Sequence, residues 1–105
     1  MKEESTLEQE LHQICELCGR EGVQTTRHHL TPKAKGGTHL PTARLCRSCH
    51  KQIHALYTNQ DLITLGLTSV PALQADPEIA RYLKWIRKQP ATSVPRVRKS
   101  ERVRS

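Results

Sequence analysis

The sequence is poor in the large apolar side chains that fill the core of most small domains. It has no phenylalanine, aromatic residues make up 3% of its 105 residues, and hydrophobic residues make up 35%. A chain of this length forms one domain at most. Because so small a core rarely holds a fold unaided, we expect disulfides or a structural metal to contribute.

Long hydrophobic runs are also absent. No stretch approaches the roughly 20 apolar residues that a membrane span requires. The first residues, MKEESTLEQE, are acidic and polar, whereas a secretory signal has a basic start and an apolar centre. We therefore expect a cytoplasmic protein with no membrane partner, in which paired cysteines bind metal more often than they form disulfides.

Acidic residues are few compared with basic ones. The chain has 10 Asp and Glu against 17 Lys and Arg, which gives a net charge of +7. The charge is uneven, since residues 1–14 carry −3 and residues 79–105 carry +8. A positive half of this kind suits a polyanionic partner such as nucleic acid. A solvated basic tail has the same composition, so charge alone does not separate the two interpretations.

The first half of the chain predicts a helix, two strands and a second helix. A capping-box pattern and an apolar stripe predict the first helix over residues 5–14. Alternation predicts a strand over 23–29, and Pro and Gly residues predict a loop over 31–37. A second, irregular strand is expected over 38–45, followed by a helix over 47–57.

The second half predicts further helices and a tail. A short helix is expected from a cap at Asn59 through Leu65, with Gly66 and Pro71 as breakers. Asp76-Pro77 is a strong helix start, because proline suits the first helical position. The apolar stripe of that helix, flanked by Trp85, consists of Ile79, Tyr82, Leu83 and Ile86. Residues 91–105 lack apolar periodicity, so we expect a disordered basic tail.

The cysteines form two matching pairs, Cys15-x-x-Cys18 and Cys46-x-x-Cys49. Each pair can place two thiolates on one ion, and two pairs complete the closed tetrahedral shell of a structural zinc. Separate redox dithiols are the alternative. Two symmetric pairs fit one shared ion better, so we predict a structural Zn²⁺ whose binding supplies folding free energy.

Four histidines form a second pattern, with His28-His29 at the end of the first predicted strand and His50-x-x-x-His54 on the following helix. Residues at i and i+4 share one helical face, so both imidazoles can hold one ion. A third ligand from the strand would leave coordination positions open, as in catalytic metal sites. A single histidine is more often a surface or packing residue, which is how we interpret His12 and His39.

These motifs, in this order, resemble those of the HNH endonucleases. The matching segments are Cys15-x-x-Cys18-Gly19, RHHLTPKAKGG at 27–37 and LCRSCHKQIH at 45–54. The resemblance implies an α+β protein with a ββα-metal core, stapled by the four-cysteine zinc site and flanked by helices. It predicts one nuclease domain over residues 1–90, with its core at 15–57 and a helical part at 59–90.

The resemblance also assigns roles. His28, His50 and His54 look like ligands of a catalytic divalent ion (Mg²⁺, Mn²⁺, Ni²⁺ or Zn²⁺), and His29 looks like the general base. The reaction implied is hydrolysis of a phosphodiester in nucleic acid, with DNA as the expected substrate and a 5′ phosphate on the product. One position departs from the family pattern: Pro41 stands where the family has an asparagine that helps to fix the loop carrying the base.

Several cations surround these motifs and are predicted to contact phosphates without reading sequence. They are Arg27, Lys33, Lys35, Arg44, Arg47 and Lys51. The tail cations Arg96, Arg98, Lys99, Arg102 and Arg104 would add nonspecific, salt-sensitive affinity. The main prediction is an endonuclease of low sequence specificity. The alternatives are a zinc-stabilised module that binds nucleic acid without cutting, favoured by the missing asparagine, and a purely structural protein with two zinc ions.

Overall fold

The computed structural model describes residues 13–97 and 99–104. The helix expected over 5–14 lies outside them, apart from its end, where Gln13 forms a β-bridge with Val23. Arg98 also lies outside the described residues. Within the described residues no helix is long and apolar enough to span a membrane.

The core of the fold is an antiparallel pair of strands followed directly by a helix. Strand β1 (Thr25–His29) pairs with β2 (Thr42–Cys46), so that His29 lies opposite Thr42 and Thr25 opposite Cys46. Helix α2 (Arg47–Leu56) begins at the next residue. This small α+β arrangement confirms the predicted order of strand, loop, strand and helix, and it fits a ββα-metal core.

The loop between the strands is more regular than predicted. It contains a 3-10 turn, η1 (Lys33–Lys35), which ends at Gly36 with a φ of 89°. Gly37 then passes so close to Thr31 that an added Cβ would lie 1.7 Å from the Thr31 carbonyl oxygen. Only glycine fits there, which explains why the loop requires the second residue of its Gly-Gly pair.

Three further helices complete the buried core. Helix α3 (Asn59–Thr64) is capped by Thr58 and Asp61 in a capping box, and not by Asn59 as the sequence suggested. Helix α4 (Val70–Ala75) was not predicted, because Pro71 was interpreted as a breaker; it stands in the first turn, where proline is tolerated. Helix α5 (Pro77–Ile86) starts at the predicted Asp76 cap.

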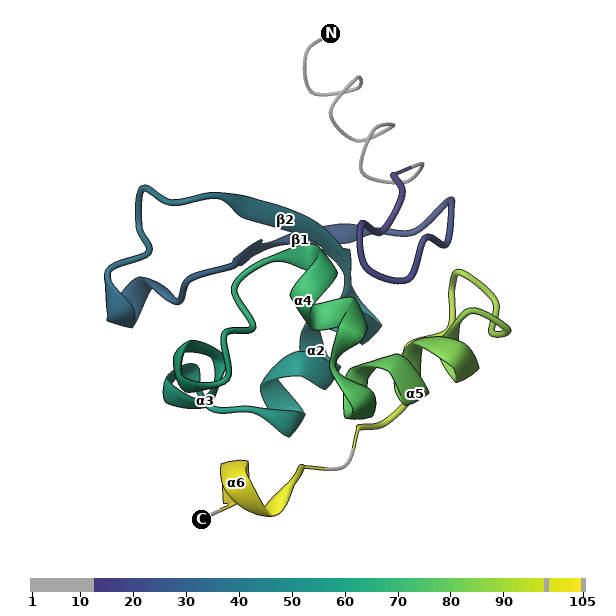
Figure 1. The fold of residues 1–105 in the computed structure, drawn as a ribbon. Coiled ribbons are helices and arrows are strands. Elements are labelled where there is room, and N and C mark those ends of the chain that lie inside the picture. Colours follow the sequence, from purple (N-terminus) through teal and green to yellow (C-terminus); the bar gives the residue numbers. More distant parts are fainter. Residues whose placement is uncertain (1–12, 98, 105) are drawn as a thin grey trace, which may run out of the picture.

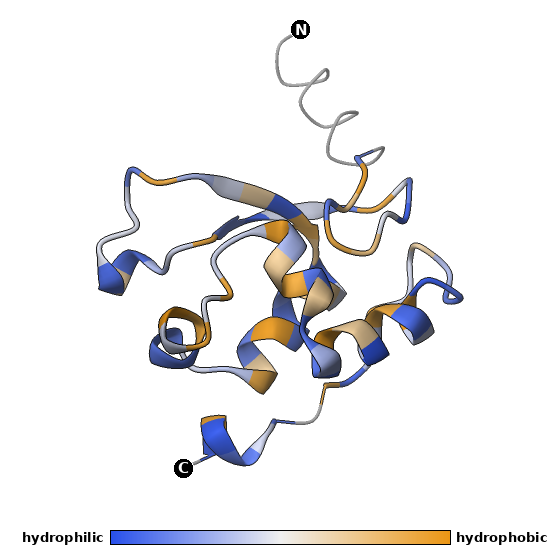
Figure 2. Cartoon of the chain, viewed as in Figure 1, coloured by the Kyte–Doolittle hydropathy of each residue, from blue (hydrophilic) through white to orange (hydrophobic). Residues whose placement is uncertain are grey.

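Helix α2 is central to this arrangement and packs against both strands and α5 (Figure 1). Hydrophobic and hydrophilic positions alternate along α2, α4 and α5, which is the pattern of helices with one buried face (Figure 2). The largest fully buried apolar side chains are Leu17, Leu45, Ile53, Leu62, Leu73, Ile79, Leu83 and Ile86. Trp85 stays 46% exposed beside this core.

The segment after Pro90 makes defined contacts in the structure, where its lack of periodicity led us to expect disorder. The Ser100 backbone N–H donates to the Ala55 carbonyl (2.8 Å), and the Ser100 hydroxyl donates to the Leu56 carbonyl (2.6 Å). These are terminal carbonyls of α2, which have no partner within their own helix. Helix α6 (Glu101–Arg104) follows. Such contacts depend on single polar groups and leave no periodic pattern in a sequence.

Candidate metal centres and nuclease site

The four cysteines come together in one buried cluster. Their Sγ atoms lie within 4.8 Å of one another, and each residue is at most 4% exposed. None is in a disulfide. The backbone N–H of Cys18 donates to Cys15 Sγ (3.3 Å) and that of Cys49 to Cys46 Sγ (3.5 Å), which orients each pair as a knuckle. The donor set fits a structural metal such as zinc.

Residues outside the knuckles hold this cluster in place. Arg20, only 8% exposed, donates from Nη2 to Cys46 Sγ (3.3 Å) and from Nη1 to the Pro90 carbonyl (2.6 Å). The guanidinium of Arg87, on the segment that follows α5, donates to the Cys18 carbonyl (3.0 Å). A cluster of thiolates is strongly negative, so the buried guanidinium both offsets its charge and ties it to the second half of the chain.

Three of the predicted histidines also meet. Ring nitrogens of His28, His50 and His54 lie within 4.8 Å of one another, and the ring centroids are 5.0–5.4 Å apart. His28 projects from β1 toward α2, which carries the other two one turn apart. Histidines separated by more than 20 positions in the sequence therefore form one cluster that can hold a cation.

His28 is the most unusual member of this cluster. It is 1% exposed, yet within the described part of the chain neither of its ring nitrogens has a hydrogen-bond partner. A buried polar atom without a partner is costly, so such atoms call for an explanation. A metal ion bound by the lone pair of one nitrogen would supply that explanation. The residues present therefore fit a second metal.

The local environment keeps all three imidazoles neutral. Burial, reinforced by His50, His54 and His29, lowers the pKa of His28 to about 4. Burial and the nearby His54 lower the pKa of His50, and burial lowers that of His54. Metal ligands must be unprotonated, so the cluster is ready to bind a cation at neutral pH.

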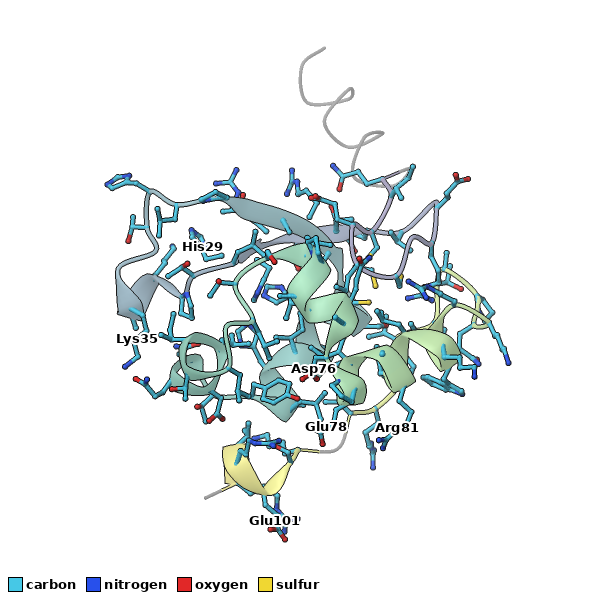
Figure 3. The ribbon with its side chains drawn as sticks, in the orientation of Figure 1. His29, Lys35, Asp76, Glu78, Arg81 and Glu101 are labelled. Carbon is cyan, nitrogen blue, oxygen red and sulfur yellow. The ribbon has the colours of Figure 1, made fainter. Side chains whose placement is uncertain are left out.

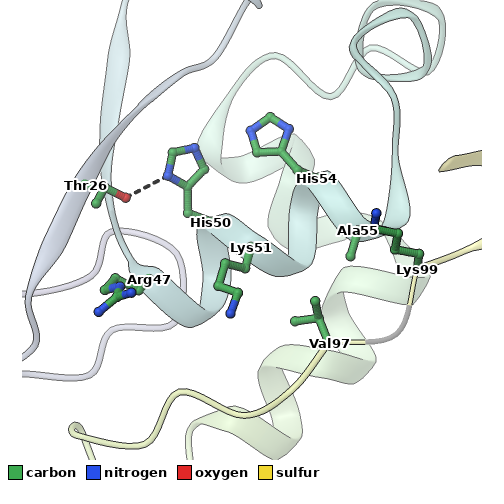
Figure 4. Close-up of a pocket in the computed structure, with 8 residues that line it drawn as sticks. All are labelled: Thr26, Arg47, His50, Lys51, His54, Ala55, Val97 and Lys99. Carbon is green, nitrogen blue, oxygen red and sulfur yellow. Dashed lines mark hydrogen bonds between the residues drawn. The ribbon is translucent and has the colours of Figure 1, made fainter.

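Thr26 orients one of these rings and was missed by the sequence analysis. Its hydroxyl lies 2.7 Å from His50 Nδ1 and 3.4 Å from the Leu45 carbonyl oxygen (Figure 4). A hydroxyl that donates to the carbonyl accepts from Nδ1–H, which leaves His50 Nε2 free for a metal. Thr26 lies two residues before His28, so both lie on the same face of the strand. This spacing could have indicated that Thr26 lies near the histidines.

His29 lies at the end of β1, where the strand enters the loop that carries Lys35 (Figure 3). It is half-buried and lines a cavity of about 400 Å³ together with His28, His50 and His54. Adjacent residues of a regular strand point to opposite faces. Both histidines reach one cavity because the strand ends at His29.

The backbone at Pro41 ties down the loop next to His29. The Leu30 N–H, directly after His29, donates to the Pro41 carbonyl (3.3 Å). Within the loop, the Lys35 and Gly37 N–H groups both donate to the Pro32 carbonyl, at 2.9 and 3.1 Å. The position that lacks the family's asparagine side chain thus still contributes a main-chain bond beside His29.

The predicted phosphate contacts divide into two groups. Arg27 and Lys33 line the cavity of His29, and Arg47 and Lys51 line a second cavity, described below. The other two, Lys35 and Arg44, are exposed and line neither cavity. Asn59, the first residue of α3, also lines the His29 cavity, whereas the sequence suggested it only as a helix cap.

Comparison with known proteins agrees with this geometry. A family model for the HNH endonuclease matches residues 15–56, which include both cysteine pairs and the four histidines. The protein YisB of Bacillus subtilis (strain 168), which is named as uncharacterized, is 62% identical over 87 residues, 83% of this chain and 86% of YisB. This chain belongs to the HNH endonuclease family. No solved structure matches this HNH protein.

Proposed function

We propose that this HNH protein is a metal-dependent endonuclease that hydrolyses phosphodiester bonds, in DNA and with low sequence specificity. The observation that carries the proposal is the cluster of the buried His28 with His50 and His54, beside the half-buried His29. Within the described residues, both ring nitrogens of His28 lack a hydrogen-bond partner. Pure binding of nucleic acid needs no such cluster. We propose residues 1–90 as the nuclease domain, and residues 91–105 as a basic segment that follows it.

In this proposal His29 is the general base. Its imidazole accepts a proton from water as the water oxygen attacks phosphorus, and the bond from phosphorus to the 3′ oxygen breaks. The leaving 3′ oxygen takes a proton from solvent, so the products carry a 5′ phosphate and a 3′ hydroxyl. Arg27 and Lys33, on the wall of the same cavity, hold the phosphate through charge. The main-chain bond from Leu30 to Pro41 keeps the segment after His29 in place.

Two metal ions are part of the proposal. Cys15, Cys18, Cys46 and Cys49 would hold a structural Zn²⁺, and His28, His50 and His54 would hold a divalent cation. When bound, that cation supplies charge stabilisation at the phosphate and the leaving oxygen. Three imidazole nitrogens suit Ni²⁺ or Zn²⁺ better than Mg²⁺, which prefers oxygen ligands. Mn²⁺ lies between these cases, and all four ions are candidates.

The test compares wild type, His29→Ala and His39→Ala for nicking of supercoiled plasmid with each of the four ions. His39 is exposed and lies outside the cavity, so its variant is a matched control. We expect His29→Ala to lose cleavage while its zinc content and fold are retained, and His39→Ala to cut like wild type. Equal cleavage by His29→Ala and wild type would reject the assignment of the base.

A non-catalytic module that binds nucleic acid is the second candidate, and Pro41 at the asparagine position favours it. It predicts that wild type binds DNA but does not cut with any of the ions. A purely structural protein with two zinc ions predicts two tightly held zincs and no affinity for DNA. Metal analysis together with the nicking assay separates the three.

A further inference from the structure

A second cavity adjoins the histidine cluster and is not used by the mechanism above. It has a volume of about 420 Å³ and lies between α2 and the C-terminal segment that carries Val97 and Lys99 (Figure 4). It shares His50 and His54 with the cavity of His29, and its other walls are different. A nucleic-acid strand that passes over these two imidazoles can therefore occupy both cavities.

The outer wall of this cavity is attached to α2. Ser100, directly after Lys99, is bonded to two carbonyls at the C-terminal end of α2, those of Ala55 and Leu56. Two residues further on, the Arg102 guanidinium lies 5.1 Å from the centroid of the Tyr57 ring and pairs with Glu78 at 3.0 Å. These bonds hold Val97 and Lys99 opposite the helix.

The chemistry of the walls suits a nucleotide. Arg47 and Lys51 lie one turn apart on α2, beside His50 and His54. Lys99, from the C-terminal segment, lies next to Ala55 at the other side of the cavity (Figure 4). Ala55 and Val97 add apolar surface, and none of the described residues that line the cavity carries a carboxylate. A cationic side next to an apolar side matches a phosphate joined to a sugar and base. The volume falls within the roughly 300–1,000 Å³ of ordinary ligand sites.

We propose that this cavity binds the unpaired nucleotide next to the phosphodiester held at the histidines, with Arg47, Lys51 and Lys99 contacting the phosphates that flank it. The proposal rests on the nuclease function proposed above and deepens it. A nucleotide within a duplex is stacked and paired, so only an unpaired one can enter a cavity of this size without the cost of unstacking. The protein is then expected to prefer single-stranded or frayed DNA over intact duplex.

The test measures binding of a short fluorescent single-stranded DNA, by anisotropy and over a salt series, with no divalent ion added. The variants are Lys99→Gln, Val97→Trp, which fills the cavity without changing charge, and Arg96→Gln. Arg96 is an exposed cation on the same segment that does not line the cavity, so it controls for the charge of the tail.

We expect Lys99→Gln to reduce the slope of log affinity against log salt by about 0.7, the value for one lost phosphate contact on a single strand. We expect Val97→Trp to weaken binding by about tenfold, the scale of the contacts of one base. Arg96→Gln, which removes a tail cation outside the cavity, should change both quantities less than Lys99→Gln does. Equal effects of Arg96→Gln and Lys99→Gln, or wild-type binding by Val97→Trp, would overturn the proposal.

These measurements need no cleavage, so the two proposals can fail separately. If wild type cuts no DNA but Lys99→Gln and Val97→Trp bind as expected, the nuclease function fails and the nucleotide site stands. If wild type cuts DNA and both variants bind like wild type, only the nucleotide site fails. Equal binding of single-stranded and duplex DNA by wild type would also reject the nucleotide site.

Discussion

Replacing His28 by leucine is expected to stabilise this protein while it destroys the second metal site. Wild type buries an imidazole whose two nitrogens have no hydrogen-bond partner within the described residues. Leucine of similar size removes those polar atoms and keeps the packing between β1 and α2. A buried polar group without a partner costs about 1–3 kcal/mol, and this is the stabilisation expected when no ion occupies the histidine site.

An added ion should make wild type more stable than His28→Leu. An ion present at one hundred times its dissociation constant stabilises wild type by about 2.7 kcal/mol, and it does nothing for the variant. For a domain of this size, 1 kcal/mol corresponds to a melting temperature change of about 4–8 °C. His28→Leu should therefore melt several degrees above wild type without added ion, and lose the increase that Ni²⁺ or Zn²⁺ gives wild type.

The pH dependence carries a second check on the same residue. The pKa of His28 is about 4 in the folded protein and near its ordinary 6.5 in the unfolded chain, so acid protonates the unfolded chain first. Wild type thus loses stability as the pH falls from about 6.5 toward 4, and His28→Leu lacks this loss. The advantage of the variant should widen by about 1 kcal/mol between pH 7 and pH 5.5.

The measurement is urea unfolding of both proteins with the cysteine site loaded and His39→Leu as the exposed control, which should change stability by less than about 0.5 kcal/mol. If His28→Leu is less stable than wild type by 1 kcal/mol or more without added ion, the buried ring has partners of its own. The inference that one of its nitrogens is reserved for a metal would then be refuted.

Three further outcomes are expected. Thr26→Val should lower metal affinity at the histidine cluster about 10–100-fold, because valine cannot form a hydrogen bond with His50 Nδ1. Thr26→Ser should restore the affinity. Unchanged affinity of Thr26→Val in calorimetry would exclude this positioning role. Complete chelation of the cysteine-bound metal should unfold the domain, since such sites supply on the order of 10 kcal/mol, and a native circular dichroism spectrum afterwards would contradict it. Arg20→Met should cost roughly 2–3 kcal/mol in urea unfolding through lost bonds to Cys46 Sγ and the Pro90 carbonyl, and a neutral result would mean that these bonds contribute little.

The parts of the fold that depend on short-range sequence patterns could be predicted from the sequence. The spacing of the cysteine pairs and of His50 and His54 fixed which side chains would meet, since a CxxC knuckle and a helical turn are rigid units. The Asp76-Pro77 start of α5 was equally plain, because both residues act within one turn. The predicted roles of the histidines in catalysis stay predictions.

What could not be predicted depends on contacts between distant segments. Helix α4 was not predicted because proline is tolerated in the first turn of a helix but breaks its interior. The sequence alone did not show which of these positions Pro71 occupies, since tertiary packing decides it. No sequence motif linked Thr26 or Asn59 to the histidines, and both matter through their place beside the cluster. Lys99 and Ser100 are likewise positioned by the end of α2, more than 40 residues earlier in the chain.

The order of the thiols along the chain has a consequence for assembly. All four are present once Cys49 has been added, while α3, α4 and α5 are encoded after it. During synthesis from the N-terminus, the complete set of thiols is made before Leu73, Ile79 and Leu83, which share the buried core with the cysteines. Capture of the ion can thus precede burial of the apolar core. A shortage of zinc would therefore stop folding of this protein at an early step.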